Sequence, residues 1–329
     1  MGRLVDGVWE TGPVAPKSTD GSFQRADSAW RNWITADGEP GPTGRGGFAA
    51  ESGRYHLYVS LACPWAHRTL ILRALKELTP HISVDVVDPL MGNDGWTFAT
   101  DFPRTTGDTV LGTAFLREVY LADEPEATTK VTVPVLWDKA TSRIVSNESS
   151  EIVRMLNSAF DGVTGDTLDF HPEALRDEID RVNERVYPGL NNGVYRAGFA
   201  RTQAAYDIPA REVFETLDWM EDRLGRSRYL AGDRLTEADW RAATTLFRFD
   251  LVYNTHFKCN RRRIIDYPRL WDYTRELYQT PGIAETVDFE HIVNHYYRSH
   301  PEINPTRIIP IGPVIDWTEP CRGGTRAAA

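Results

Sequence analysis

A strand–helix–strand run between residues 54 and 89 constrains the fold more than any other part of the chain. Residues 54–60 (RYHLYVS) and 83–89 (SVDVVDP) are rich in β-branched and aromatic side chains, which is typical of strands. Four apolar residues between them recur at helical spacing and make one apolar face: Ile71, Ala74, Leu75 and Leu78. Two strands joined by a helix should be parallel, with a right-handed crossover.

The residues that follow extend this unit into a recognisable order of elements. Residues 90–129 form a long insertion with a short helical candidate, FLREVYLA. Residues 131–138 and 142–149 are two predicted strands joined by the turn-prone DKATS, and a helix with an apolar side follows to Phe160. The order β-α-β, insertion, β-β-α predicts a thioredoxin-like α/β domain with a mixed sheet whose last two strands form a hairpin.

The rest of the chain divides by composition. Residues 1–50 are rich in Gly, Pro, Ser and Asp and predict an irregular extension that docks in part through its aromatic residues. Beyond a polar linker the pattern is helical, and Thr236 with Asp239 forms a capping box. We expect five segments: an extension (1–50), a thioredoxin-like domain (51–160), a linker (161–172), an all-α domain (173–300) and a tail (301–329).

Cys63 is the first candidate for a catalytic residue. Pro64 suits the first position of a helix, which would place Cys63 at the N-cap beside free backbone N–H groups. That environment stabilises a thiolate and lowers the pKa of a thiol. Ala66 occupies the place of a resolving cysteine, so a mixed disulfide would need an external thiol. The alternative is that Cys63 is a buried structural cysteine, as most lone cysteines of intracellular proteins are.

Two further segments could bind a ligand. Pro134, inside an apolar run, fits either a cis Val133–Pro134 bond that exposes backbone groups to a ligand or a trans bond on an edge strand. Glu148 and Ser149 open a helix, where backbone N–H groups can bind an anion. The same residues can serve as an ordinary N-cap.

Composition excludes several classes of protein. The formal net charge of −10 over 329 residues argues against a nucleic-acid partner, because phosphate binding needs clustered cations. No stretch approaches 18 consecutive apolar residues, so we expect no membrane-spanning segment. Three cysteines are too few for a disulfide framework, and the N-terminus lacks the apolar core of a signal peptide. These features predict a cytoplasmic protein, and we assign no metal site.

Taken together, these motifs resemble the glutathione transferases, which join a thioredoxin-like domain to an all-α domain. CPWAHR at 63–68 and NNGVYRAGFA at 191–200 resemble the Xi class, the glutathionyl-hydroquinone reductases, and TEADW at 236–240 resembles the superfamily's helical capping box. The resemblance covers nearly the whole chain.

The resemblance implies a role for individual residues. Cys63 matches the nucleophile and Tyr195 a tyrosine that donates a proton to the substrate, while Tyr253 and Tyr296 match tyrosines that hydrogen-bond the thiolate or line an aromatic pocket. The residues implied to contact glutathione are Trp96, Lys130, Val131, Thr132, Val133, Glu148 and Ser149. Trp96 would pack on glutathione, residues 130–133 would pair with its backbone, and Glu148 with Ser149 would anchor its γ-glutamyl end.

The function implied is glutathione-dependent reduction of S-glutathionyl-hydroquinones to hydroquinones through a mixed disulfide on Cys63. The implied partners are an aromatic glutathione conjugate and a second copy of the chain. General thiol transfer or dehydroascorbate reduction by the same cysteine is one alternative. Another is a non-catalytic ligand-binding paralogue. Lys130 stands where the resemblance leads us to expect arginine, which leaves another thiol such as mycothiol open.

Overall fold

The computed structural model describes residues 2–12 and 18–321. Within that part the chain forms two compact units, each described here by itself. The first contains residues 2–12, 26–168 and 288–295, and the second contains residues 18–25, 169–287 and 296–321. The predicted tail therefore reaches past the described residues. No helix among the described residues is long and apolar enough to cross a membrane.

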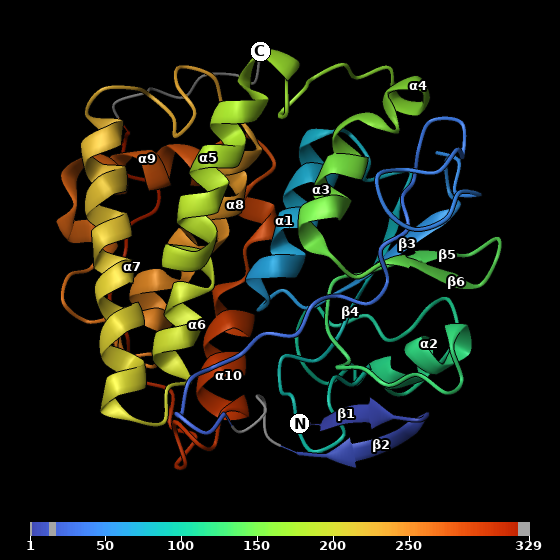
Figure 1. Cartoon of the computed structure of the whole chain (residues 1–329), viewed down its shortest axis with the longest axis horizontal. Helices are drawn as coiled ribbons and strands as arrows, with labels where there is room; N and C mark the ends of the chain where they lie inside the picture. The colour runs from blue at the N-terminus through green and yellow to red at the C-terminus, as the bar shows by residue number, and fades with distance from the viewer. Residues whose placement is uncertain (1, 13–17, 322–329) are drawn as a thin grey trace. The chain divides into compact units, whose positions relative to one another are not determined.

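The first unit is built on a four-stranded mixed sheet in the order β4-β3-β5-β6 (Figure 1). Its strands are β3 (Tyr55–Val59), β4 (Ser83–Val86), β5 (Val135–Asp138) and β6 (Arg143–Ser146). β3 pairs in parallel with β4 and antiparallel with β5, and β5 with β6 makes the predicted hairpin. The thioredoxin-like prediction is confirmed, although β5 begins only after Pro134.

Helices complete the first unit. α1 (Pro64–Leu75) and α3 (Ser149–Ser158) lie side by side against the sheet, and α2 (Leu116–Asp123) contacts β6 (Figure 1). The short α4 (Asp161–Thr164) follows α3. Leu57 of β3, Ile71 of α1 and Leu156 of α3 are fully buried, so the apolar faces read from the sequence form this core.

The prediction of a wholly irregular extension is wrong at its start. β1 (Gly2–Val5) and β2 (Val8–Thr11) form an antiparallel hairpin. Asp6 and Gly7 join them with φ values of 47° and 76°, the left-handed pair that a two-residue type I′ turn requires. Leu4 exchanges both backbone hydrogen bonds with Thr129, at 2.8 and 3.0 Å, which ties the hairpin to the sheet unit.

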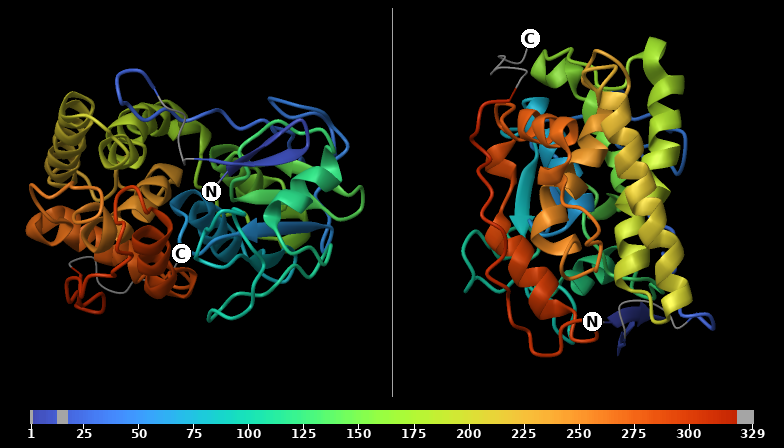
Figure 2. Two further views of the ribbon diagram at one scale, coloured as in Figure 1. Left: turned by 90° about the horizontal axis from the view of Figure 1, so that it is seen from below. Right: turned by 90° about the vertical axis from the view of Figure 1, so that its left-hand side faces the viewer.

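The second unit is helical, as predicted. Its regular helices are α5 (Arg176–Val186), α6 (Gly193–Gly198), α7 (Gln203–Leu224), α8 (Glu237–Arg248), α9 (Pro268–Tyr278) and the end of α10 (Phe289–Ser299). Shorter turns are η1 (Glu173–Leu175), η2 (Tyr187–Asn191), η3 (Phe249–Tyr253), η4 (Ile264–Asp266) and η5 (Ala284–Thr286). α7 runs beside α6 (Figure 2), and α8 is almost entirely buried.

Pro188 and Gly189 lie in a π-helical turn, η2, that leads from α5 toward α6. Gly189 is required there by close packing, because a Cβ would lie 2.1 Å from the Thr216 hydroxyl of α7. The predicted capping box begins α8. The Asp239 carboxylate accepts a hydrogen bond from the Thr236 N–H at 2.8 Å.

Candidate functional site

Cys63 lies where the sequence predicts, at the N-cap of α1. Its backbone is extended (φ −77°, ψ 122°), Pro64 is the first helical residue, and the His67 N–H donates to the Cys63 carbonyl at 3.0 Å. The side chain is half-buried, whereas Cys259 and Cys321 are buried. The predicted location is therefore confirmed and a sealed core position is excluded. The reactivity of the thiol stays a prediction.

The segment before β5 lies beside this sulfur. The Val133–Pro134 bond is cis, and the Cys63 Sγ is 3.5 Å from the Val133 carbonyl oxygen. Burial alternates from Val131 to Val133, as in an extended chain, with Thr132 exposed between two buried valines. Within the described residues the Val133 N–H donates to no acceptor, which leaves it able to pair with a ligand's backbone.

Two residues that the sequence analysis missed hold this segment. The Tyr120 hydroxyl donates to the Thr132 carbonyl at 2.9 Å and accepts from the Asn147 side chain at 3.2 Å. Burial raises the pKa of Tyr120, so the hydroxyl keeps the proton that it donates. These partners lie 12 and 27 residues apart in sequence, so no local pattern could show them.

The predicted anion anchor lies at the start of α3. Glu148 is the N-cap, and its carboxylate accepts from the backbone N–H and the hydroxyl of Ser150 at 2.9 and 2.8 Å. Ser28 donates to the other oxygen at 3.0 Å. Burial alone would raise the pKa of Glu148, but these bonds and the charge of Arg68 outweigh it and hold the pKa below its usual value. Glu148 is therefore charged, and Ser149 is the first helical residue beside it.

Trp96 is almost fully buried. His295 stacks on one face of its ring, with centroids 4.9 Å apart and planes inclined by 22°. The Nδ1 atom of His295 lies 2.9 Å from the Pro89 carbonyl oxygen, which fixes the imidazole. One face of Trp96 is thus already covered by protein, so packing on glutathione is left to its remaining surface and stays a prediction. Lys130 is half-buried in the same unit.

The second unit brings the three predicted tyrosines together. The Tyr296 hydroxyl lies 2.5 Å from the Tyr195 hydroxyl and 2.9 Å from the Tyr253 hydroxyl. Tyr195 follows the π-helical turn η2 and Tyr253 ends another, η3, and such turns are frequent at functional sites. Burial raises the pKa of Tyr253 and of Tyr296 well above the usual value, so both stay neutral and able to donate.

Further rings surround these tyrosines in the same unit. Phe257 stacks on Tyr253 with centroids 5.5 Å apart, and Phe199 lies 6.1 Å from Tyr195. His256 and His300 are both buried, with ring nitrogens 3.0 Å apart. A cluster of aromatic rings of this kind suits the binding of a flat aromatic ligand.

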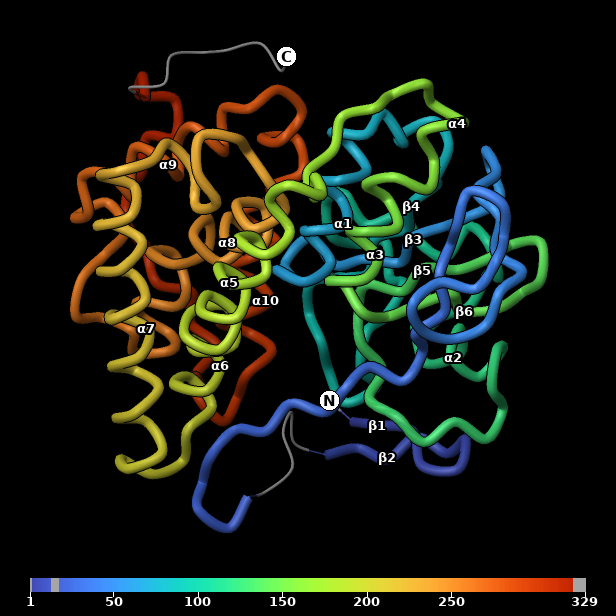
Figure 3. The backbone as a smooth tube through the Cα atoms, turned by 45° about the horizontal axis from the view of Figure 1, so that its top comes forward, coloured from blue at the N-terminus to red at the C-terminus, as the bar shows by residue number. Residues whose placement is uncertain are grey.

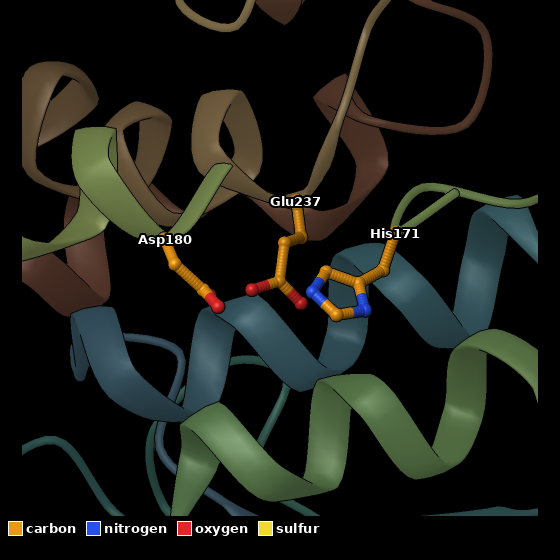
Figure 4. Close-up of side chains that lie close together, drawn as sticks. All are labelled: His171, Asp180 and Glu237. Atoms are coloured by element: carbon orange, nitrogen blue, oxygen red, sulfur yellow. The ribbon is translucent and has the colours of Figure 1, made fainter. Parts of the chain in front are cut away.

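Figure 4 shows a separate group of side chains that could hold a metal: His171, Asp180 and Glu237, with ligand atoms within 4.8 Å of one another. Glu237 already accepts from the Asn183 amide at 3.2 Å and pairs with Arg241 at 3.2 Å. These donors account for the buried carboxylate without an ion. We therefore assign no metal to this group.

Comparison with known proteins decides the family. Residues 62–159 match the family "Glutathione S-transferase, N-terminal domain" and residues 203–276 match "Glutathione S-transferase, C-terminal domain". The chain is 59% identical to glutathionyl-hydroquinone reductase YqjG of Escherichia coli K12, over 97% of this chain and 98% of that protein. The chain belongs to the Xi class of glutathione transferases.

Other members of the class agree with this assignment. Glutathionyl-hydroquinone reductase PcpF of Sphingobium chlorophenolicum is 50% identical over 95% of this chain and 96% of its own. The glutathione-bound structure of YqjG superposes with a TM-score of 0.91 at 56% identity, covering 98% of each chain. The Xi-class transferase of Natrialba magadii gives 0.90 at 48% identity, covering 98% of this chain and 96% of that one. The predicted family and fold are confirmed.

Proposed function

We propose that this Xi-class transferase reduces S-glutathionyl-hydroquinones to hydroquinones, with glutathione as the reductant and Cys63 as the nucleophile. Two relatives named for this activity, the glutathionyl-hydroquinone reductases YqjG and PcpF, are 59% and 50% identical to the chain over nearly its whole length. The observation that carries the proposal is the half-buried Cys63 at the N-cap of α1, with Ala66 where a resolving cysteine would stand. Such a cysteine needs an external thiol to complete a cycle.

In the first half-reaction the Cys63 thiolate attacks the sulfur of the conjugate. The carbon–sulfur bond breaks, its electron pair goes to the aromatic carbon, and Tyr195 donates the proton that makes the new C–H bond. The aromatic carbon is reduced, Cys63 is left in a mixed disulfide with glutathione, and Tyr195 is left as a phenolate. The hydroxyls of Tyr296 and Tyr253 stay protonated and stabilise negative charge at the site.

In the second half-reaction another glutathione regenerates the enzyme. Its thiol proton returns to the Tyr195 phenolate, and its sulfur attacks the glutathione sulfur of the mixed disulfide. Oxidised glutathione leaves, and Cys63 returns to the thiolate. Each turnover therefore consumes one conjugate and one glutathione.

We propose that the first unit binds glutathione through the residues that the sequence singled out. The Val133 backbone would pair with the tripeptide backbone, with Lys130, Val131 and Thr132 in the same extended segment. Glu148 would hold the γ-glutamyl amino group, and Ser149 would hold the carboxylate at the start of α3. Trp96 would pack on the tripeptide. We extend the proposal to a cytoplasmic homodimer, with neither membrane nor nucleic acid as a partner.

The direct test is product formation from a glutathionyl-hydroquinone, with Cys63→Ala beside wild type and Cys259→Ala as the matched control. Loss of hydroquinone release in Cys63→Ala alone is the expected result. Full activity in Cys63→Ala would exclude the mechanism. A small mixed disulfide assayed in parallel separates this activity from general thiol transfer, and mycothiol in place of glutathione tests the choice of thiol.

A further inference from the structure

The N-terminal extension contributes a segment to the second unit. Residues 18–25 lie beside the helices of that unit (Figure 3). The Thr202 hydroxyl donates to the Asp20 carbonyl at 3.0 Å, and the Arg201 N–H donates to the Gly21 carbonyl at 3.0 Å. Gly21 has φ +81°, and a Cβ there would lie 2.9 Å from the Thr202 methyl group. The segment is therefore fitted to the unit by close backbone contact.

The end of this segment covers Tyr195. Phe23 stacks on Phe199, with centroids 5.4 Å apart, and lies 6.4 Å from the Tyr195 ring. The guanidinium carbon of Arg25 is 5.0 Å from the centroid of Tyr195, within the range of a cation–π contact. The Arg25 Nε also donates to the Asn192 side chain at 2.9 Å. Asn192 is the N-cap of α6, the helix that contains Tyr195. The start of this helix therefore also fixes the Arg25 guanidinium over the Tyr195 ring.

We propose that Arg25 is a positioning residue for the reaction, holding a positive charge over Tyr195 while that tyrosine gives up its proton. The inference rests on the proposed function, in which Tyr195 is the proton donor. A cation over a neutral phenol ring is held by the ring quadrupole alone, whereas a phenolate adds a full negative charge. The attraction therefore grows as the proton leaves, and an interaction that is stronger in the transition state raises the rate of the chemical step.

Two other arginines of this unit, Arg196 and Arg248, act on other groups. Arg196, the neighbour of Tyr195 in α6, pairs with Glu212 at 2.5 Å, so its charge is compensated there. Arg248 favours the ionised forms of Tyr253 and Tyr296, but burial outweighs it at both. Arg25, in contrast, lies over the Tyr195 ring itself.

The test compares Arg25→Met, which keeps most of the stem, with Arg25→Lys, which keeps the charge. Gln24→Ala, an exposed neighbour, is the control. The readouts are the single-turnover rate of hydroquinone release at saturating conjugate and the concentration that gives half that rate. We expect Arg25→Met to slow the saturated rate by about fivefold, the size of a modest cation–π contact, with the half-saturating concentration nearly unchanged. Arg25→Lys should recover most of the rate.

Two results would overturn the inference while leaving the proposed function intact. One is an Arg25→Met rate equal to that of wild type. The other is an equal loss in the Met and Lys variants with a raised half-saturating concentration, which would show only a docking role for the segment. A wild-type enzyme that releases no hydroquinone would remove the proposed function and the inference together.

Discussion

The hydroxyl oxygens of Tyr195 and Tyr296 lie 2.5 Å apart, although the two residues are 101 positions apart in sequence. Tyr296 is buried and Tyr195 is half-buried, so the buried hydroxyl supports the accessible one. A hydrogen bond in a site of low polarity is stronger than the same bond in water. This pair therefore gives the proposed proton donor a fixed direction and a partner for its developing charge.

Replacing Tyr296 with Phe should lower kcat by about tenfold, since the bond to a charged acceptor contributes roughly 1.5 kcal/mol and about 1.4 kcal/mol is a factor of ten. Steady-state assays with a glutathionyl-hydroquinone measure this. Tyr297→Phe is the matched control, because that hydroxyl donates to the Leu251 carbonyl at 3.0 Å. Equal activity in Tyr296→Phe and Tyr297→Phe would show that the pair plays no part in the reaction.

Glu148→Gln should raise the KM for glutathione by about tenfold, because the amide loses the charge that would hold the γ-glutamyl amino group. The exposed Glu126→Gln is the control. An unchanged KM in the Glu148 variant would place the γ-glutamyl end elsewhere.

The same carboxylate should make stability depend on pH. The pKa of Glu148 is lower in the folded state than in the unfolded chain, so its contribution is present above the unfolded pKa. That contribution is lost as the pH falls through the lowered folded pKa. Denaturant unfolding at neutral and acidic pH should therefore show a smaller acid-induced loss of stability in Glu148→Gln than in wild type. An equal loss in the two proteins would contradict the assignment.

Asp239→Asn should lower the free energy of unfolding by about 3 kcal/mol, because the amide group would face donors in a buried site. The Asp239 carboxylate accepts from the Leu230 N–H at 2.8 Å, the Thr236 N–H at 2.8 Å and the Tyr273 hydroxyl at 2.8 Å. Denaturant unfolding, with the exposed Asp233→Asn as control, measures the loss. A change below about 0.5 kcal/mol, the usual limit for surface substitutions, would show that the capping box contributes little.

The thiols should differ sharply in reactivity. Burial raises the pKa of Cys259 to about 12, so it should resist alkylation in the folded protein. Cys63, at the start of a helix, should be alkylated with a midpoint below that of an ordinary thiol. Peptide mapping after timed iodoacetamide treatment across a pH series measures both residues. An ordinary midpoint at Cys63 would instead favour the ligand-binding paralogue.

Local patterns in the sequence were enough to predict the sheet unit. The strands at 54–60 and 83–89 and the helix after Cys63 carry periodicity and a proline signal, and the structure confirms all three. The hairpin at residues 2–11 was missed because the composition of the first 50 residues obscured the Asp6–Gly7 turn signal. The polar turn and alternating residues could have revealed it.

The tertiary parts of the site could not be derived from local pattern. Tyr195 and Tyr296 were found through a family resemblance, because their pairing joins distant helices. Tyr120 and Asn147 support the Thr132 carbonyl, and Arg25 covers Tyr195 from a distant part of the sequence. In sequence these are ordinary surface or helix residues, and only the folded chain gives them a partner.

The most direct test of the central claim is intact-mass and peptide mass spectrometry of the enzyme after one equivalent of a glutathionyl-hydroquinone, with no free glutathione. The account predicts one glutathione in disulfide linkage on Cys63 and one equivalent of released hydroquinone. A protein that carries the aromatic ring on Cys63, or that releases hydroquinone while Cys63 stays unmodified, would contradict it.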